Sequence, residues 1–132
     1  MNGRPGQSPK PSRAQRVGGR LKAELMELLL RGGLRDPALD GVYVTNVELT
    51  ADLRHARVYF RLTRPTVSAK DQQSALAALS GAHGYLRREL GPRLQLQYMP
   101  DLKFFWDEGF DRAARVDAVL AEIRREDEEG RQ

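Results

Sequence analysis

Residues 75–90, ALAALSGAHGYLRREL, carry a helical pattern that is interrupted by two glycines and then resumes. Leucines recur at helical spacing on both sides of the interruption, at Leu76, Leu79, Leu86 and Leu90. A glycine inside a helix costs about 1 kcal/mol relative to alanine, so the closely spaced pair Gly81 and Gly84 predicts a helix, a kink and a second helix. We also expect a positive φ at Gly84, and the rest of the fold to be organised around this kink.

Two arginines follow the kink directly. Arg87 and Arg88 lie in the first turns of the second helix, and we expect both side chains to be exposed and suited to phosphate. Gly81-Ala82-His83-Gly84 has the GxxG pattern with which KH domains clamp nucleotide backbones between two short helices. A single GxxG is a weak signal, and a helical hairpin whose glycines only fit a tight corner is the alternative. For His83 a role as a loop residue is favoured over a base contact.

Length and composition indicate one soluble domain, with 132 residues and 40% hydrophobic content. No apolar run approaches the roughly 18 residues that span a bilayer, and residues 1–15 lack the hydrophobic segment of a secretory signal. The chain contains no cysteine, which removes disulfides and thiolate metal sites. We therefore expect a cytoplasmic protein with no membrane contact, and the polar composition predicts a monomer.

The net charge of +4 is unevenly distributed along the chain. Residues 1–23 carry only basic charges, whereas residues 126–129 are the acidic run Glu-Asp-Glu-Glu. This asymmetry favours a polyanionic partner. The first part of the chain therefore adds four candidate contacts to that partner, Arg13, Arg16, Arg20 and Lys22.

Hydrophobic periodicity predicts the elements before the kink. Ser12 and Gln15 form a capping-box pattern for a helix that reaches Arg31, with a firm part starting near Arg20. Residues 42–50 and 55–63 alternate regularly as the two strands of an antiparallel hairpin, and the second strand is predicted to point Ala56, Val58, Phe60 and Leu62 inward. The helix that leads up to the kink starts near Ser68. The predicted core includes Leu25, Val47, Leu49, Val58, Phe60 and Leu86.

Two elements are predicted after the kink. The segment LQLQYMPDLKFF, residues 94–105, alternates as a third strand with a bulge or an end at Pro100. Residues 111–125 have the apolar spacing of an amphipathic helix.

The sequence offers no constellation for catalysis. Only two histidines are present, His55 and His83, and no serine or threonine stands in a nucleophile elbow or a phosphate loop. The acidic group from Asp101 to Asp111 matches no calcium loop and is interpreted as a solvated turn. We predict no catalytic residue, no metal site and no cofactor. Tyr59, outward between two arginines, either stacks on RNA or packs against the neighbouring strand.

The order helix, strand, strand, broken helical pair, strand is that of a type II KH domain. With its segments RAQRV, DPAL, VELTADLRHARVYF, GYLRREL and PDLKFFWD in this order, the chain resembles the ribosome-binding factor A family from about Ser12 to Ile123. This is a family of bacterial factors that assemble the small (30S) ribosomal subunit. The resemblance implies an α+β, type II KH-like fold of order α-β-β-α-(kink)-α-β. Its three-stranded sheet would carry the helices on one face, with a C-terminal helix added.

In this family an Ala-x-Gly kink replaces the GxxG loop, and the resemblance places that kink at Ala82, His83 and Gly84. Because Gly81 precedes this kink and completes a GxxG pattern, the sequence is compatible with two backbones, a tight kink or an open loop. The resemblance also implies binding to the immature 30S subunit at its 16S rRNA, near the decoding region. It further implies support of late maturation and 5′-end processing, especially in the cold, and release with help from an assembly GTPase.

The resulting hypothesis is a non-catalytic, RNA-binding assembly factor. Phosphates would be contacted by Arg87, Arg88 and Arg93, with Arg13, Arg16, Arg20 and Lys22 adding to the footprint. The expected division is a disordered basic arm at 1–11, a KH-like domain at 12–106, and a C-terminal helix with an acidic tail at 107–132. The alternative is a protein adaptor that docks on ribosomal proteins with little RNA contact, and the salt dependence of binding separates the two.

Overall fold

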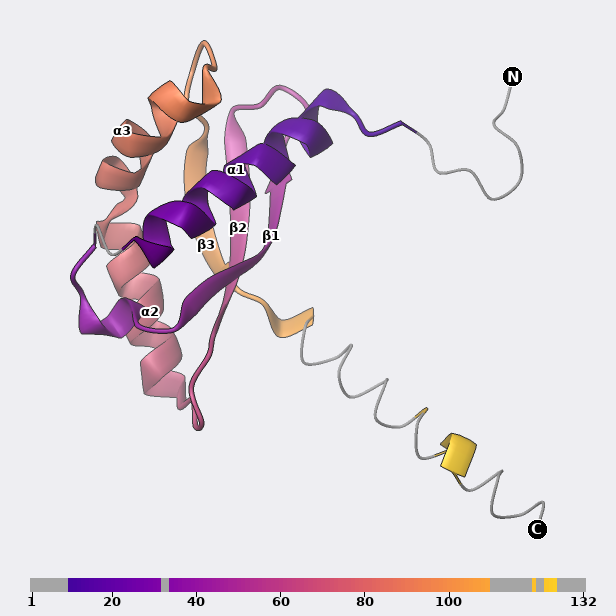
Figure 1. The fold of residues 1–132 in the computed structure, drawn as a ribbon, viewed down its shortest axis with the longest axis vertical. Coiled ribbons are helices and arrows are strands. Elements are labelled where there is room, and N and C mark those ends of the chain that lie inside the picture. The colour runs from indigo at the N-terminus through magenta and orange to yellow at the C-terminus, as the bar shows by residue number, and fades with distance from the viewer. Residues whose placement is uncertain (1–9, 32–33, 110–119, 121–122, 126–132) are drawn as a thin grey trace.

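The computed structural model describes residues 10–31, 34–109, 120 and 123–125. Figure 1 shows the element order. It is helix α1 (Arg13–Leu30), the short 3₁₀ helix η1 (Pro37–Leu39), strands β1 (Val42–Leu49) and β2 (His55–Leu62), helices α2 (Ala69–Gly81) and α3 (His83–Leu94), and strand β3 (Asp101–Trp106). The α+β, KH-like order predicted from the sequence is confirmed. Residues 1–9 of the predicted arm, 1–11, and most of the predicted helix at 111–125 lie outside the described residues.

Helix α1 begins where the capping box predicts. The Ser12 Oγ accepts from the Gln15 N–H at 3.1 Å, and the Gln15 Oε1 accepts from the Ser12 N–H at 2.8 Å. The helix is continuous through Gly18, so the weak start expected before Arg20 is absent. Gly18 is buried, and a Cβ there would lie 3.2 Å from the Val47 carbonyl oxygen. This glycine lets α1 approach β1 closely.

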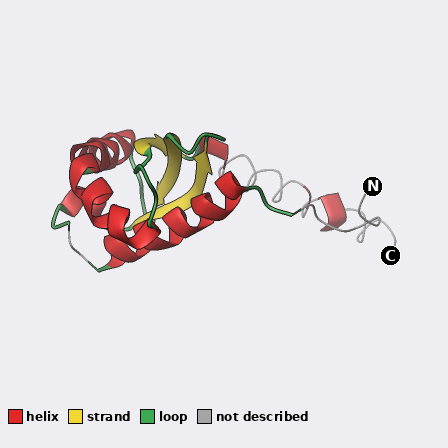
Figure 2. Ribbon diagram, turned by 90° about the horizontal axis from the view of Figure 1, so that it is seen from above, coloured by secondary structure: helices red, strands yellow, loops and turns green. Residues whose placement is uncertain are grey.

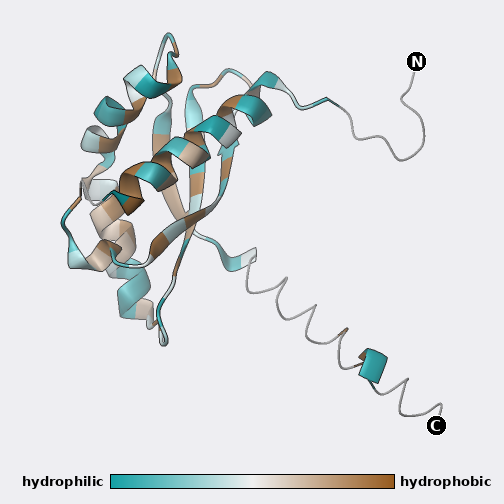
Figure 3. Ribbon diagram, viewed as in Figure 1, coloured by the Kyte–Doolittle hydropathy of each residue, from teal (hydrophilic) through white to brown (hydrophobic). Residues whose placement is uncertain are grey.

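The three strands form one sheet in the order β1-β2-β3, with β1 antiparallel and β3 parallel to the central β2. The helices pack on one face of this sheet, as the view from above shows (Figure 2). The inward set predicted for β2 is confirmed, because Ala56, Val58, Phe60 and Leu62 are all buried. The predicted core members Leu25 and Leu86 are fully buried as well. Apolar residues accordingly recur along the strands and on α1 in Figure 3.

Strand β1 departs from the regular alternation that the sequence predicts. Its pairing with β2 shifts between Val44 and Asn46, which leaves Thr45 as an extra residue. Val42 and Val44 are therefore buried before the bulge, while the predicted inward residues Val47 and Leu49 are half-buried after it. A bulge moves the inward face by one residue, and the sequence pattern alone did not reveal it.

The third strand lies later than predicted. Helix α3 continues through Gly91 and Pro92 to Leu94, and β3 starts only at Asp101. The prediction of a strand from Leu94 was wrong because Leu94 belongs to a helical series of buried leucines, with Leu86 and Leu90. Gln95 then ends the helix in the left-handed conformation, with φ 52°. In the part of the chain that the structure describes, no helix is both long enough and apolar enough to cross a membrane.

Candidate nucleic-acid interface

One residue joins helices α2 and α3. Ala82 has φ −87° and ψ 0° and serves both as the C-cap of α2 and as the N-cap of α3. Its N–H donates to the carbonyl oxygen of Ala78 at 3.0 Å, and its own carbonyl accepts from the Leu86 N–H at 2.9 Å. Since the hydrogen bonds of both helices reach this residue, the junction is a tight kink, and the open loop is excluded.

The space outside the kink is open. Neither Gly81 nor Gly84 has a positive φ, so the left-handed backbone expected at Gly84 is wrong. A Cβ added at either position would meet no atom within 4 Å. Both residues are exposed. The fold itself therefore requires neither glycine for conformation or packing, and a backbone approaching from solvent would find room here.

His83 ties the kink to the sheet. Its Nε2 lies 3.0 Å from the Asp101 Oδ1, at the first residue of β3. The side chain of His83 is half-buried, with 32% of it exposed. This contact holds α3 against β3 at the kink. The prediction of a loop residue is wrong, because His83 is the first residue of α3, and a contact to a base stays a prediction.

The two arginines after the kink have different surroundings. Arg87 is half-buried, and its Nη2 donates to the Met99 carbonyl at 3.0 Å. Its Nε is buried and has no hydrogen-bond partner among the described residues. Arg88 is exposed. The expectation that both are exposed is therefore wrong for Arg87, which supports the segment before β3, and Arg88 is the one available to a phosphate.

Arg93 and Arg20 lie together where α3 contacts α1. The Arg93 Nη1 is 3.3 Å from the Glu24 Oε2, and the Arg20 Nη2 donates to the Arg93 carbonyl at 3.1 Å. Glu24 neutralises part of the positive charge of this pair. These arginines therefore join two helices, and only Arg20 is exposed.

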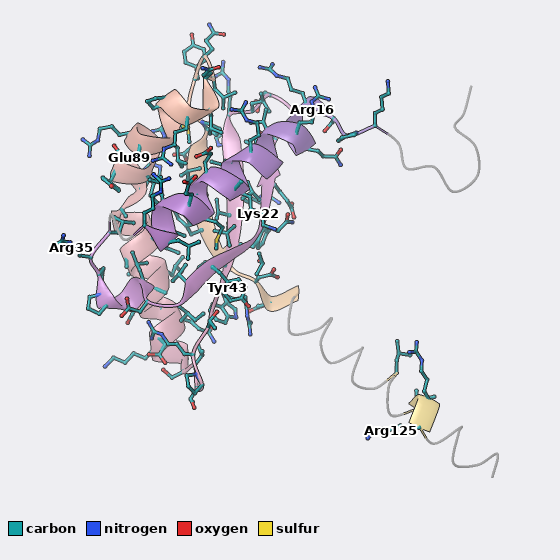
Figure 4. The ribbon with its side chains drawn as sticks, in the orientation of Figure 1. Arg16, Lys22, Arg35, Tyr43, Glu89 and Arg125 are labelled. Carbon is teal, nitrogen blue, oxygen red and sulfur yellow. The ribbon has the colours of Figure 1, made fainter. Side chains whose placement is uncertain are left out.

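The remaining basic candidates lie on α1. Lys22 is half-buried and donates to the Thr45 carbonyl at 3.0 Å, at the bulge of β1. Arg13 and Arg16 are exposed at the first turns of α1. Figure 4 shows Arg16 at the outer end of that helix, far from Arg35 beside the kink. The structure therefore does not gather all the predicted basic residues into one patch around the kink.

Two shallow hollows flank the kink, and each contains a cation that the sequence analysis missed. One hollow is lined by Arg35 and Tyr85 together with Gly81 and Ala82. The other runs along β3, and its lining includes His83, Ser80, Lys103 and Phe105. Arg35 and Lys103 are exposed. They were missed because each lies far from the kink in the sequence, and the misplaced third strand concealed the alternation that puts Lys103 outward.

The described residues hold no group of three or more His, Cys, Asp or Glu side chains placed to bind a metal ion. Two carboxyl groups outside the kink have lowered pKa values. Hydrogen bonds from the Thr50 hydroxyl and the Arg54 N–H lower the pKa of Asp52, and hydrogen bonds from the Ser68 N–H and hydroxyl lower the pKa of Asp71. Asp71 completes the capping box of α2, so both shifts belong to turns and helix ends.

Comparison with known proteins gives consistent matches. The family model described as ribosome-binding factor A matches residues 13–120. A ribosome-binding factor A from Brevibacillus brevis is 39% identical over 117 residues, which cover 89% of this chain and 93% of the relative. Another, from Gloeobacter violaceus, is 36% identical over 121 residues, covering 90% and 92%. The crystal structure of ribosome-binding factor A from Thermus thermophilus has 29% identity and a TM-score of 0.59, covering 70% of this chain and 93% of that one.

Proposed function

Because the chain belongs to the ribosome-binding factor A family, we propose that it binds the small ribosomal subunit at its 16S rRNA. The observation that carries the proposal is the open space outside the tight kink between α2 and α3. Two glycines there leave space that the fold does not use, and the exposed Arg88 follows on α3. Backbone approach together with a guanidinium group is suited to a sugar-phosphate chain.

The proposed contact surface starts at Ala82, His83 and Gly84 and includes Arg88. Arg35 and Lys103 join it, since they line the two hollows beside the kink. Arg13, Arg16 and Arg20 lie away from the kink and would strengthen RNA binding through long-range electrostatic attraction of the phosphates. Arg87, Arg93 and Lys22 make contacts within the protein, so we assign them a smaller share of any phosphate binding.

We extend the proposal to the role that family membership implies. The protein would act without catalysis on the immature 30S subunit, supporting late maturation and 5′-end processing of the rRNA, above all in the cold. It would work as a cytoplasmic monomer and leave the subunit with help from an assembly GTPase. In this proposal residues 12–106 form the RNA-binding domain, residues 1–11 a basic arm, and residues 107–132 a C-terminal helix and acidic tail.

A pull-down of the full chain with purified small and large subunits over a range of salt concentrations tests this function. We expect binding to small subunits that weakens steeply with salt. Arg88→Glu should lower the slope of log affinity against log salt by roughly 0.7 to 0.9 for each phosphate that the variant no longer neutralises. Arg54→Glu is the matched control, because it makes the same charge change at an exposed residue on the turn between β1 and β2.

Two results would count against the proposal. Absence of binding to small subunits at low salt would remove the ribosomal function altogether. Binding that is nearly independent of salt, with Arg88→Glu equal to wild type, would favour the protein adaptor over the RNA-binding factor.

A further inference from the structure

The face of the sheet opposite the helices carries an ordered pattern of side chains. The strand register aligns three rows across it, namely Glu48 with Arg57 and Lys103, Asn46 with Tyr59 and Phe105, and Tyr43 with Arg61. Their neighbours along β2, Ala56, Val58 and Phe60, point to the helices and are buried. The three rows therefore belong to the surface that α1, α2 and α3 leave uncovered.

The middle row holds two aromatic rings in contact. The centroids of Tyr59 and Phe105 are 5.7 Å apart, with 32° between the ring planes. Phe105 is 40% exposed, although it lies on a regular strand whose inward neighbours complete the core. Ring area left to water on a sheet face offers a stacking surface for another flat ring.

Cations stand in the rows beside these rings. Arg57 and Lys103 are adjacent across β2 and β3, and both are exposed. On the other side, the Arg61 guanidinium lies 4.3 Å from the centroid of the Trp106 ring. Positions two residues apart on a strand are separated by about 7 Å, so charged groups and rings alternate at short range. The only acidic member of the three rows is Glu48.

We propose that this open face binds single-stranded RNA. Bases would stack on Tyr59 and Phe105, and backbone phosphates would contact Arg57 and Lys103. A duplex would not fit this site, because paired bases keep their faces within the helical stack. The inference rests on the proposed function and deepens it. The kink would contact the sugar-phosphate chain, and the sheet face would select an unpaired segment of the rRNA.

Binding of a short single strand can be followed through the fluorescence of Trp106, the only tryptophan of the chain, because its ring contacts both Arg61 of this face and the buried Phe60. The probes are an eight-nucleotide oligouridylate and an RNA duplex of the same length. Wild type should bind the single strand in preference to the duplex. Tyr59→Ala and Phe105→Ala should each weaken single-strand binding by about fivefold or more, since a stacked base contributes about 1 to 3 kcal/mol.

The matched control is Tyr98→Ala. Tyr98 is 70% exposed in the segment between α3 and β3, outside the three rows, so its removal should change single-strand affinity less than twofold. The ring variants should also leave the salt slope unchanged, because they remove no charge. Thermal melting of each variant separates a binding effect from unfolding.

Three outcomes would overturn this inference. In the first, the wild type binds the single strand and the duplex with equal affinity. In the second, both ring variants bind the single strand as tightly as the wild type does. In the third, the ring variants no longer bind small subunits but still bind the oligonucleotide. The last would indicate a protein on this face. If the oligonucleotide does not bind while small subunits still bind with a steep salt slope, the sheet-face inference fails alone. Failure of the wild type to bind small subunits would instead remove the proposed function.

Discussion

Two of the regions of this protein that contain glycine have opposite surroundings. At Gly18, where α1 crosses β1, a Cβ would lie 3.2 Å from a backbone oxygen, so the fold uses the missing side chain. At Gly81 and Gly84, on the kink between α2 and α3, a Cβ would meet nothing. Glycine lowers helix stability at all three positions, but only Gly18 is compensated by internal packing. The space at the kink is therefore available to a partner.

The largest effect should come from the core on which α1 packs. Phe60→Ala removes a fully buried ring at the centre of β2, and we expect the free energy of unfolding to fall by about 3 to 5 kcal/mol. Arg57→Ala, at an exposed position on the same strand, should change it by no more than about 0.5 kcal/mol. Urea unfolding measures both. A decrease below about 1 kcal/mol for Phe60→Ala would mean that the two faces of β2 are assigned the wrong way round.

A smaller effect tests the close approach itself. Gly18→Val places a branched side chain against the Val47 carbonyl, and we expect the free energy of unfolding to fall by about 1 to 3 kcal/mol. Gly19→Val is the control, because an added Cβ there meets no atom within 4 Å. It should be neutral or slightly stabilising, since valine favours a helix more than glycine does. Equal effects at both positions would show that Gly18 is not a packing contact.

Within the kink region, the two arginines should separate stability from binding. Arg87→Ala removes the hydrogen bond to the Met99 carbonyl and should lower the free energy of unfolding by about 1 kcal/mol. Arg88→Ala should change it by less than about 0.5 kcal/mol, and its effect should appear in small-subunit binding instead. The reverse pattern, with Arg88 more important for stability, would contradict the assignment of Arg88 as the cation available to RNA.

The smallest change is a gain in stability. Gly84→Ala should raise the free energy of unfolding by up to about 1 kcal/mol, because alanine favours the helix and the Cβ has room. If RNA approaches at the kink, the same variant should bind small subunits more weakly. Unfolding in urea and the pull-down together give both results. A more stable protein with unchanged binding would show that the open space at Gly84 is not used by the partner.

The elements that follow local rules could be predicted from the sequence alone. A capping box depends on residues three apart, so Ser12 and Ser68 both mark true helix starts. Two nearby glycines, Gly81 and Gly84, predicted a kink because they interrupt a local helical pattern, and the structure has that kink at Ala82. The inward face of β2 followed from alternation without a bulge. The family resemblance also followed from the sequence, because several short segments occur in the order typical of the family, and the comparisons confirm it.

Tertiary structure alone decided the features that depend on distant partners. The bulge at Thr45 exists in the pairing of β1 with β2, and the start of β3 depends on α3 continuing to bury Leu94 against the core. Likewise, Arg87 and Arg88 are neighbours in the sequence but differ in exposure, because Arg87 is half-buried and donates to the Met99 carbonyl while Arg88 is exposed. Local propensity acts over about one helical turn, whereas burial and register are set by residues far apart in the chain. The sequence therefore located the kink, and the fold determined which charges and rings surround it.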